Sequence, residues 1–113
     1  MSKSNTFKPI ITYYTRDSYV ECALVKIKNK CEFEMAIIPI IKKIDTIIEN
    51  IENNINFNIN VGGTCFYFSM VDGIISISCH IYHEHISEKF GYSKIYLTKE
   101  EALYIFRDIA EHT

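Results

Sequence analysis

The chain contains 113 residues, of which 48% are hydrophobic and 23% are charged, and its formal net charge is −2. This length and composition predict a single ordered domain over residues 1–113 and exclude an intrinsically disordered chain. The slightly acidic balance lacks the positive field that supplies most non-specific affinity for nucleic acids, so we expect no nucleic-acid partner.

The N-terminal third is predicted to form antiparallel strands. Residues 10–14 are expected to add an edge strand, and residues 19–38 (YVECALVKIKNKCEFEMAII) predict a hairpin that turns at residues 29–31. The expected pairs are Lys26 with Glu34, Lys28 with Glu32, Ile27 with Phe33 and Val25 with Met35. Because opposite charges face one another in this pairing and apolar side chains do the same, it favours a hairpin over a helix.

An amphipathic helix is predicted at about 39–53. Isoleucines recur along this segment at steps of three and four residues, which places them on one helical face. The stripe consists of Ile37, Ile41, Ile44, Ile48, Ile51 and Ile55, and it is widened by Ile40 and Ile47. Pro39 suits the first helical turn, where its missing N–H is not needed. We expect this helix to cover the apolar face of a sheet.

Residues 55–83 predict a three-stranded antiparallel meander. Asp72-Gly73 suits the two positive φ values of a type I′ hairpin turn, and Gly62-Gly63 offers a second two-residue turn. Pairing across these turns separates an apolar face from a polar face, a separation that a shift of one residue would destroy. The apolar face is expected to carry Ile55, Phe57, Ile59, Thr64, Phe66, Phe68, Met70, Ile75, Ile77, Cys79 and Ile81. The polar face is expected to carry Asn56, Asn58, Asn60, Cys65, Tyr67, Ser69, Ser76, Ser78 and His80, together with Val71 and Ile74 beside the turn.

The C-terminal segment predicts a short strand at residues 94–97 and a helix at about 99–111. Thr98 and Glu101 have the spacing of a capping box, and acidic residues enrich the first helical turn. The complete fold is therefore predicted to be α+β. It consists of an antiparallel sheet, made of the N-terminal hairpin and the meander at about 55–83, packed on one face by the helices at about 39–53 and 99–111. The other sheet face is expected to be open to water or to a partner.

The start of the sequence, MSKSNTFKPIITYY, lacks the apolar segment and cleavage site of a signal peptide, and no apolar run is long enough to span a bilayer. We therefore expect a cytoplasmic protein with no membrane partner. Thiols stay reduced in the cytoplasm, and none of the cysteines forms a CxxC motif, so we expect free thiols. These cysteines are Cys22, Cys31, Cys65 and Cys79.

The sharpest candidate for chemistry is the row of Asn60, Cys65 and His80 on the polar face. Directly opposed Cβ atoms of neighbouring strands lie about 4.5–5.5 Å apart. At that distance a histidine can lower the pKa of a thiol, and an amide can orient the imidazole ring. A meander offers no evident pocket or oxyanion hole, however, and a polar face requires such residues in any case. We therefore expect no catalytic site, and a thiol-dependent enzyme is the alternative.

Histidines are concentrated in CHIYHEH, residues 79–85. His83 and His85 share one face of an extended strand and are weak candidates for metal ligands, because a zinc site requires further ligands on the same side. A solvated strand end explains these histidines better than a metal site does. We expect no metal ion and no other cofactor.

The function that these features favour is protein binding. Isoleucine far outnumbers leucine, and asparagine and lysine are plentiful, which is the bias of an AT-rich gene from a mobile element, phage or AT-rich bacterium. A small acidic domain with an open polar and aromatic sheet face predicts an inhibitor, and our first hypothesis is an immunity protein that blocks the active site of a cognate toxin. The expected contact residues are Asn58, Tyr67, Ser78, His80, Tyr82 and His83. The alternatives are a small Cys/His thiol-dependent or metal-dependent enzyme, a phage anti-defence protein and a structural homodimer.

Overall fold

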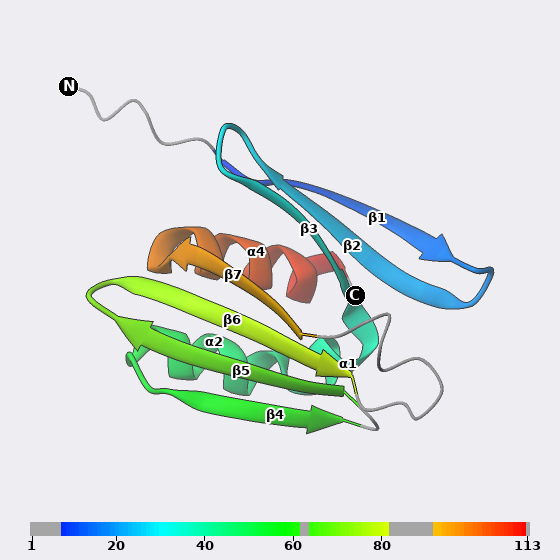
Figure 1. Ribbon diagram of the computed structural model, residues 1–113. Helices are drawn as coiled ribbons and strands as arrows, with labels where there is room; N and C mark the ends of the chain where they lie inside the picture. Colours follow the sequence, from blue (N-terminus) through cyan, green and yellow to red (C-terminus); the bar gives the residue numbers. More distant parts are fainter. Residues whose placement is uncertain (1–7, 62–63, 82–91, 113) are drawn as a thin grey trace.

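The computed structural model describes residues 8–61, 64–81 and 92–112, and it describes only the backbone at residues 61, 64, 79–81, 92 and 93. The elements are β1 (Ile10–Arg16), β2 (Val20–Ile27), β3 (Cys31–Ala36), α1 (Ile37–Lys42), α2 (Ile44–Glu52), β4 (Phe57–Val61), β5 (Thr64–Val71), β6 (Ile74–Ile81), β7 (Tyr92–Thr98) and α4 (Lys99–His112). They confirm the predicted α+β class (Figure 1). None of the described helices has the length and apolar character needed to cross a bilayer.

The strands form two antiparallel sheets rather than the single sheet expected. Sheet A has the order β1-β2-β3, and sheet B has the order β4-β5-β6-β7. The segment predicted as a short strand at 94–97 extends over Tyr92–Thr98 and pairs along its full length with β6. It thereby occupies the β6 edge of the meander, and the N-terminal hairpin forms a separate sheet with β1.

The pairing predicted for the meander is confirmed. Phe66 lies opposite Cys79, Phe68 opposite Ile77 and Cys65 opposite His80 in the backbone ladder. The turn that fixes this register contains Asp72 and Gly73, whose φ values are 53° and 78°. Both are positive, as a type I′ turn requires, and a side chain at the second position would meet the strain that glycine avoids.

The pairing predicted for the N-terminal hairpin is wrong by two residues. Lys26 lies opposite Glu32 rather than Glu34, and Val25 lies opposite Phe33 rather than Met35. The cause is the turn, which is centred on Asn29 with a φ of 62° and is closed by the Lys30 N–H to the Ile27 carbonyl at 3.0 Å. Asparagine tolerates this left-handed conformation better than most residues. A shift of two residues leaves every side chain on its expected face.

The helix predicted at 39–53 is divided into α1 and α2. The Lys43 N–H donates to the Ile40 carbonyl, three residues earlier, and this tighter hydrogen bond ends α1. The isoleucine stripe does reach the core, but its buried members are centred on Ile40 and Ile47. Ile55, beyond the end of α2, is 48% exposed and lies outside the core.

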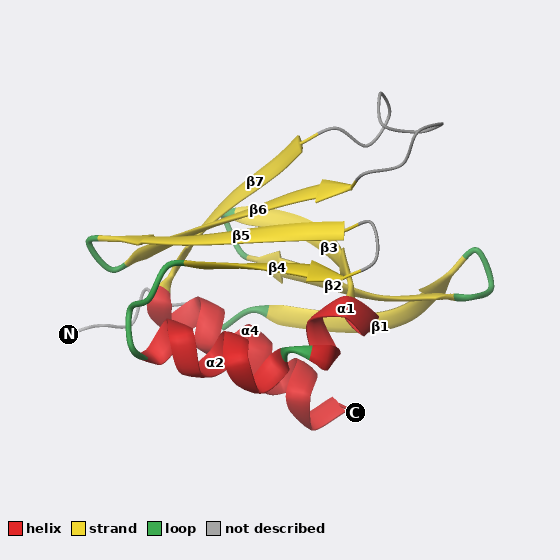
Figure 2. Cartoon of the chain, turned by 90° about the horizontal axis from the view of Figure 1, so that it is seen from below, coloured by secondary structure: helices red, strands yellow, loops and turns green. Residues whose placement is uncertain are grey.

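Both sheets and the helices share one hydrophobic core. Figure 2 shows α1, α2 and α4 together on one side of sheet B. Phe68 of β5 lies at the centre of this packing, because its ring stacks on Phe57 at a centroid distance of 4.4 Å and meets the edge of Phe106 in α4 at 5.8 Å. The core therefore joins β4, β5 and α4 through three aromatic rings.

Polar contacts at both ends of α4 connect this helix to sheet A. At its start, the predicted capping box is present: the Glu101 N–H donates to Thr98 Oγ1 at 3.1 Å, and the Thr98 N–H donates to Glu101 Oε1 at 2.8 Å. The same carboxylate oxygen accepts a hydrogen bond from Lys30 Nζ in the β2–β3 turn. Near its end, Asp108 Oδ2 accepts a hydrogen bond from Tyr13 of β1 at 2.7 Å.

Candidate protein-binding face

The side of sheet B that points away from the helices is the surface on which the sequence placed the candidate residues. Successive side chains in a strand alternate between the two faces, so the neighbours of the buried residues Ile59, Phe66, Phe68, Ile77 and Leu97 point outward. We call this surface the outer face of sheet B. Its described side chains are Asn58, Asn60, Cys65, Tyr67, Ser69, Val71, Ile74, Ser76, Ser78, Lys94 and Tyr96.

Two tyrosines are exposed on the outer face of sheet B. Tyr67 in β5 is 37% exposed, and Tyr96 in β7 is 56% exposed. Lys94 Nζ lies 5.6 Å from the centre of the Tyr96 ring, which is the range of a cation–π contact. Towards the Asp72-Gly73 turn, the apolar side chains Val71 and Ile74 are also exposed.

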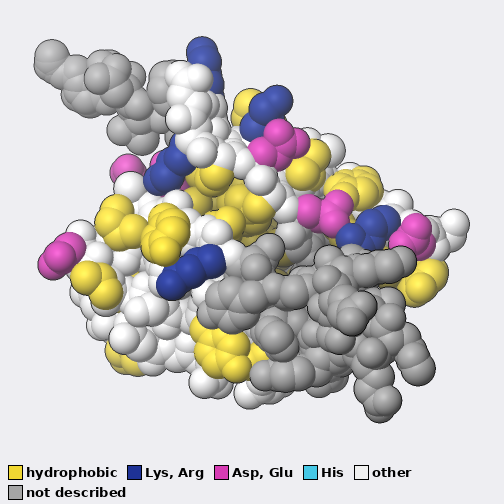
Figure 3. Space-filling model, viewed as in Figure 1, with side chains coloured by type: hydrophobic (Ala, Val, Ile, Leu, Met, Phe, Trp, Pro, Cys, Tyr) yellow, Lys and Arg dark blue, Asp and Glu magenta, His cyan; other side chains and the backbone are white. Residues whose placement is uncertain are grey.

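The composition of this face is typical of surfaces that bind proteins. Lys94 is the one charged residue among its described side chains, and the others are mainly tyrosine, serine and asparagine. Tyrosine provides a large contact area at little entropic cost, while serine and asparagine provide adaptable hydrogen bonds. In Figure 3, where sheet B faces the viewer, yellow side chains lie among white ones with little blue or magenta. A partner can therefore cover this face without removing water from many charges.

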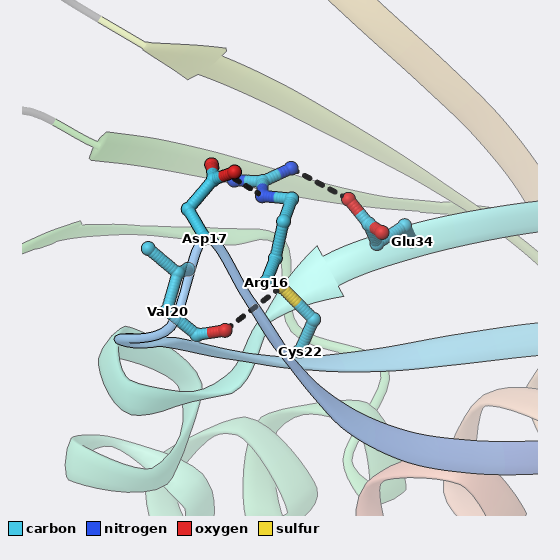
Figure 4. A network of polar contacts seen from close by, with 5 residues as sticks. All are labelled: Arg16, Asp17, Val20, Cys22 and Glu34. Carbon is cyan, nitrogen blue, oxygen red and sulfur yellow. Dashed lines mark hydrogen bonds and ion pairs between the residues drawn. The ribbon is translucent and has the colours of Figure 1, made fainter.

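The outward side of sheet A differs from this face because it carries charged side chains of both signs, two of which form an ion pair across β2. Arg16 Nη1 of β1 reaches Glu34 Oε1 of β3 at 2.7 Å, across the intervening strand β2 (Figure 4). The Arg16 Nε also lies 3.8 Å from Asp17. Cys22 is buried between the neighbouring strands, and its thiol donates to the Val20 carbonyl at 3.7 Å. Sheet A thus presents a more charged surface than the outer face of sheet B, and its Arg16 and Glu34 are already paired with each other.

The predicted contact residues differ in how accessible they are in the structure. Asn58 and Tyr67 are exposed, as expected. Ser78 is only 4% exposed and offers little area to a partner, because it lies in the middle of sheet B between Tyr67 and Lys94. The backbone of His80 lies in β6, but its side chain is outside the described part of the chain. Tyr82 and His83 lie outside the described residues.

The row of Asn60, Cys65 and His80 is assembled in the backbone as predicted. Cys65 lies directly opposite His80 in β6 and opposite Asn60 in β4. The Cys65 side chain is only 2% exposed, however, whereas a nucleophile must be reached by its substrate. The described geometry therefore offers a covered thiol on the outer face of sheet B, and it does not favour thiol catalysis.

The cysteines and histidines provide no metal site within the described ranges. Cys22, Cys31 and Cys65 are free thiols. No group of three or more histidine, cysteine or acidic side chains in residues 8–61, 64–81 and 92–112 is placed to hold a metal ion. The predicted ligands His83 and His85 lie outside the described residues.

Sequence reasoning missed a hollow of about 460 Å³ beside the β2–β3 turn. Its lining includes Lys26, Lys28, Lys30 and Cys31, and the alternating lysines of KIKNK are the sequence signal that could have indicated it. Burial raises the pKa of the Cys31 thiol, Lys30 lowers it and Glu101 raises it further, and the net direction is upward. Lys30 is paired with Glu101. The hollow therefore contains a protonated thiol of low reactivity, not an activated nucleophile.

The outer face of sheet B is therefore the described surface whose side chains best fit the binding of another macromolecule. Its tyrosines project from β5 and β7, on either side of β6, whereas sheet A carries more charges and the hollow contains a thiol whose pKa is raised. Comparison with known proteins gives no relative to guide the assignment: no protein-family model, no curated protein and no solved structure matches the chain.

Proposed function

We propose that this protein is a small protein-binding inhibitor that holds its partner on the outer face of sheet B. The observation that carries the proposal is the pair of exposed tyrosines, Tyr67 and Tyr96, on a face with a single described charge. Aromatic anchors surrounded by small polar residues are the usual source of affinity at protein interfaces. The sheet is held by packed helices on its other side, so a partner meets a preorganised surface and little chain entropy is lost on binding.

The class of inhibitor that we propose is an immunity protein, which acts in the cytoplasm by covering the active site of a cognate toxin. Small size, slight acidity and the residue bias of an AT-rich gene support this class. A rigid face can block an active site without any chemistry of its own, which accords with the covered Cys65 thiol. Steering by complementary charge would then come from residues around the face, since the face itself is nearly uncharged.

The proposal is tested by co-expressing the protein with a candidate toxin encoded beside its gene. We expect the protein to relieve growth arrest and to form a complex with the toxin that can be measured by calorimetry. The variant Tyr67→Ser/Tyr96→Ser should weaken the complex at least about tenfold, because hot-spot tyrosines each contribute about 1–2 kcal/mol or more.

The matched control is Tyr19→Ser/Tyr104→Ser. These tyrosines are also exposed, but Tyr19 lies in the β1–β2 turn and Tyr104 lies on α4, so neither belongs to the outer face of sheet B. The control should bind and protect like the unchanged protein. Failure of the unchanged protein to bind any neighbouring toxin would contradict the immunity role. An equal loss of affinity in the control would contradict the assignment of the face.

A further inference from the structure

Strand β4 is an edge of sheet B with one side of its backbone unpaired by any described strand. It pairs with β5 alone, and it forms the outer margin of the sheet in Figure 1. An edge strand presents a row of backbone N–H and C=O groups that another strand can pair with. Native proteins commonly prevent this with charged residues or proline on the edge.

The sequence around β4 contains none of these protective residues. Residues 53–63 read NNINFNINVGG, without a charge or a proline. The other described edge strands do carry charges: Arg16 in β1, Glu34 in β3 and Lys94 in β7. Asn58 and Asn60 are exposed along β4, so nothing charged lies on its outer face. Among the described edges, β4 is the one suited to accept a further strand.

The order of residues in β4 points to a second copy of this chain as the added strand. The segment FNINV is symmetric in chemical type about Ile59, with an asparagine on each side and an apolar residue beyond each asparagine. In an antiparallel pair centred on Ile59, Asn58 lies opposite the second copy's Asn60. Two amides can exchange hydrogen bonds there, because each is both donor and acceptor.

The same pairing also continues the apolar side of the sheet. Phe57 would lie opposite the second copy's Val61, and Ile59 would lie opposite its own counterpart. Ile59 is buried and Phe57 is partly buried in each copy, so the two cores would meet at the junction. A second copy of β4 provides the matching alternation of apolar and polar side chains at every position of the pair.

We propose that two copies of this chain associate through antiparallel β4–β4 pairing about a two-fold axis. The two sheets B would then form one continuous sheet, and the two outer faces would lie side by side on it. Because the contact is isologous, it pairs the free β4 edge of both copies, and assembly therefore ends at a dimer. This inference depends on the edge of β4 and not on the proposed partner, so it is tested without any partner present.

The experiment is sedimentation or light scattering from low micromolar to several hundred micromolar protein. We expect the mass to rise with concentration to twice that of the 13.2 kDa chain and to stop there. The variant Asn58→Lys/Asn60→Lys places lysine opposite lysine across the junction. Its dimer should dissociate with a constant at least about tenfold higher, because like charges directly opposite one another destabilise a strand pair.

The matched control is Thr12→Lys, which adds a lysine at an exposed position of β1, the edge of sheet A. Thermal unfolding should show that both variants remain folded, since every substituted side chain is exposed. The control should dimerise like the unchanged chain. A chain that stays monomeric at all concentrations, a dimer insensitive to the β4 lysines, a control that dissociates equally, or assembly beyond two copies would each overturn the proposal.

Discussion

Replacing Glu101 by glutamine tests whether a single carboxylate joins the start of α4 to sheet A. Glu101 Oε1 accepts hydrogen bonds from the Thr98 N–H and from Lys30 Nζ, and the Glu101 side chain is only 11% exposed. Charged hydrogen bonds contribute about 1.5–3 kcal/mol, whereas exposed ion pairs contribute about 0.2–1 kcal/mol. Because the Lys30 side chain is 34% exposed, we place Glu101→Gln between these limits, at a loss of about 1–2 kcal/mol.

The effect of Glu101→Gln should also depend on pH in a defined direction. Burial alone would raise the pKa of Glu101, but hydrogen bonds from Lys30 and Thr98 and the charge of Lys30 outweigh it, so the pKa is lowered. A carboxylate with a lowered pKa in the folded state stabilises the protein fully above its unfolded pKa of about 4.3. That stabilisation is lost as the pH falls through the folded-state pKa. The difference between the two proteins should therefore be constant near neutrality and shrink in acid.

The assay is urea unfolding at neutral pH and through the acid range, with Glu100→Gln as the control. Glu100 lies in the same helical turn but is exposed, so its loss should cost only about 0.3–0.5 kcal/mol through the helix dipole. The reasoning is refuted if Glu101→Gln is no more destabilising than Glu100→Gln. It is also refuted if the loss for Glu101→Gln is the same in acid as at neutral pH.

Three further results are expected. Phe68→Ala should lower the free energy of unfolding by about 3–5 kcal/mol in urea titrations, because Phe68 is 2% exposed, contacts two other rings and would leave a cavity. Phe68→Leu leaves a smaller cavity and should cost less. Equal losses for the two variants would contradict this reasoning. Tyr13→Phe should cost about 1 kcal/mol at neutral pH by removing the hydrogen bond to Asp108. Burial, this hydrogen bond and the Asp108 charge raise the pKa of Tyr13. The stabilisation that Tyr13 provides should therefore be complete below pH about 10 and should decline as the pH rises further. The Tyr13→Phe variant should not show this decline. Cys65 should react with iodoacetamide at least about tenfold more slowly in the folded chain than in urea, and mass spectrometry showing equal rates would restore the thiol-enzyme hypothesis.

The meander could be predicted from the sequence because its turn is chemically specific. Asp72-Gly73 is among the few dipeptides that favour positive φ at two successive positions, and this fixes the register of β5 and β6. The β2–β3 turn carries no comparable signal. A register centred on residue 29 and one centred on residue 30 place the same side chains on the same faces, so hydrophobic pattern alone does not distinguish them. The conformation of Asn29 decided between them.

The division into two sheets and the burial of individual site residues depend on tertiary contacts. Local pattern places Cys65, Tyr67 and Ser78 on one face, as the structure does, but it treats them as equally accessible. Small side chains in the middle of a sheet are covered by larger neighbours, so Cys65 and Ser78 are buried while Tyr67 remains accessible. The separation of the N-terminal strands into a sheet of their own is likewise a tertiary outcome, which no single segment encodes.

The contact between Tyr13 and Asp108 has a consequence for the order in which the molecule is made. These residues are 95 positions apart in the chain, and the Lys30–Glu101 contact spans 71 positions. During synthesis, the three strands of sheet A emerge first and can pair with one another, but α4 does not yet exist to cover them. Helix α1, which contacts β2, is translated directly after these strands, but the contacts of sheet A with α4 form only after α4 has been translated. Tyr13 in β1 thus reaches its final environment only after α4 has been made.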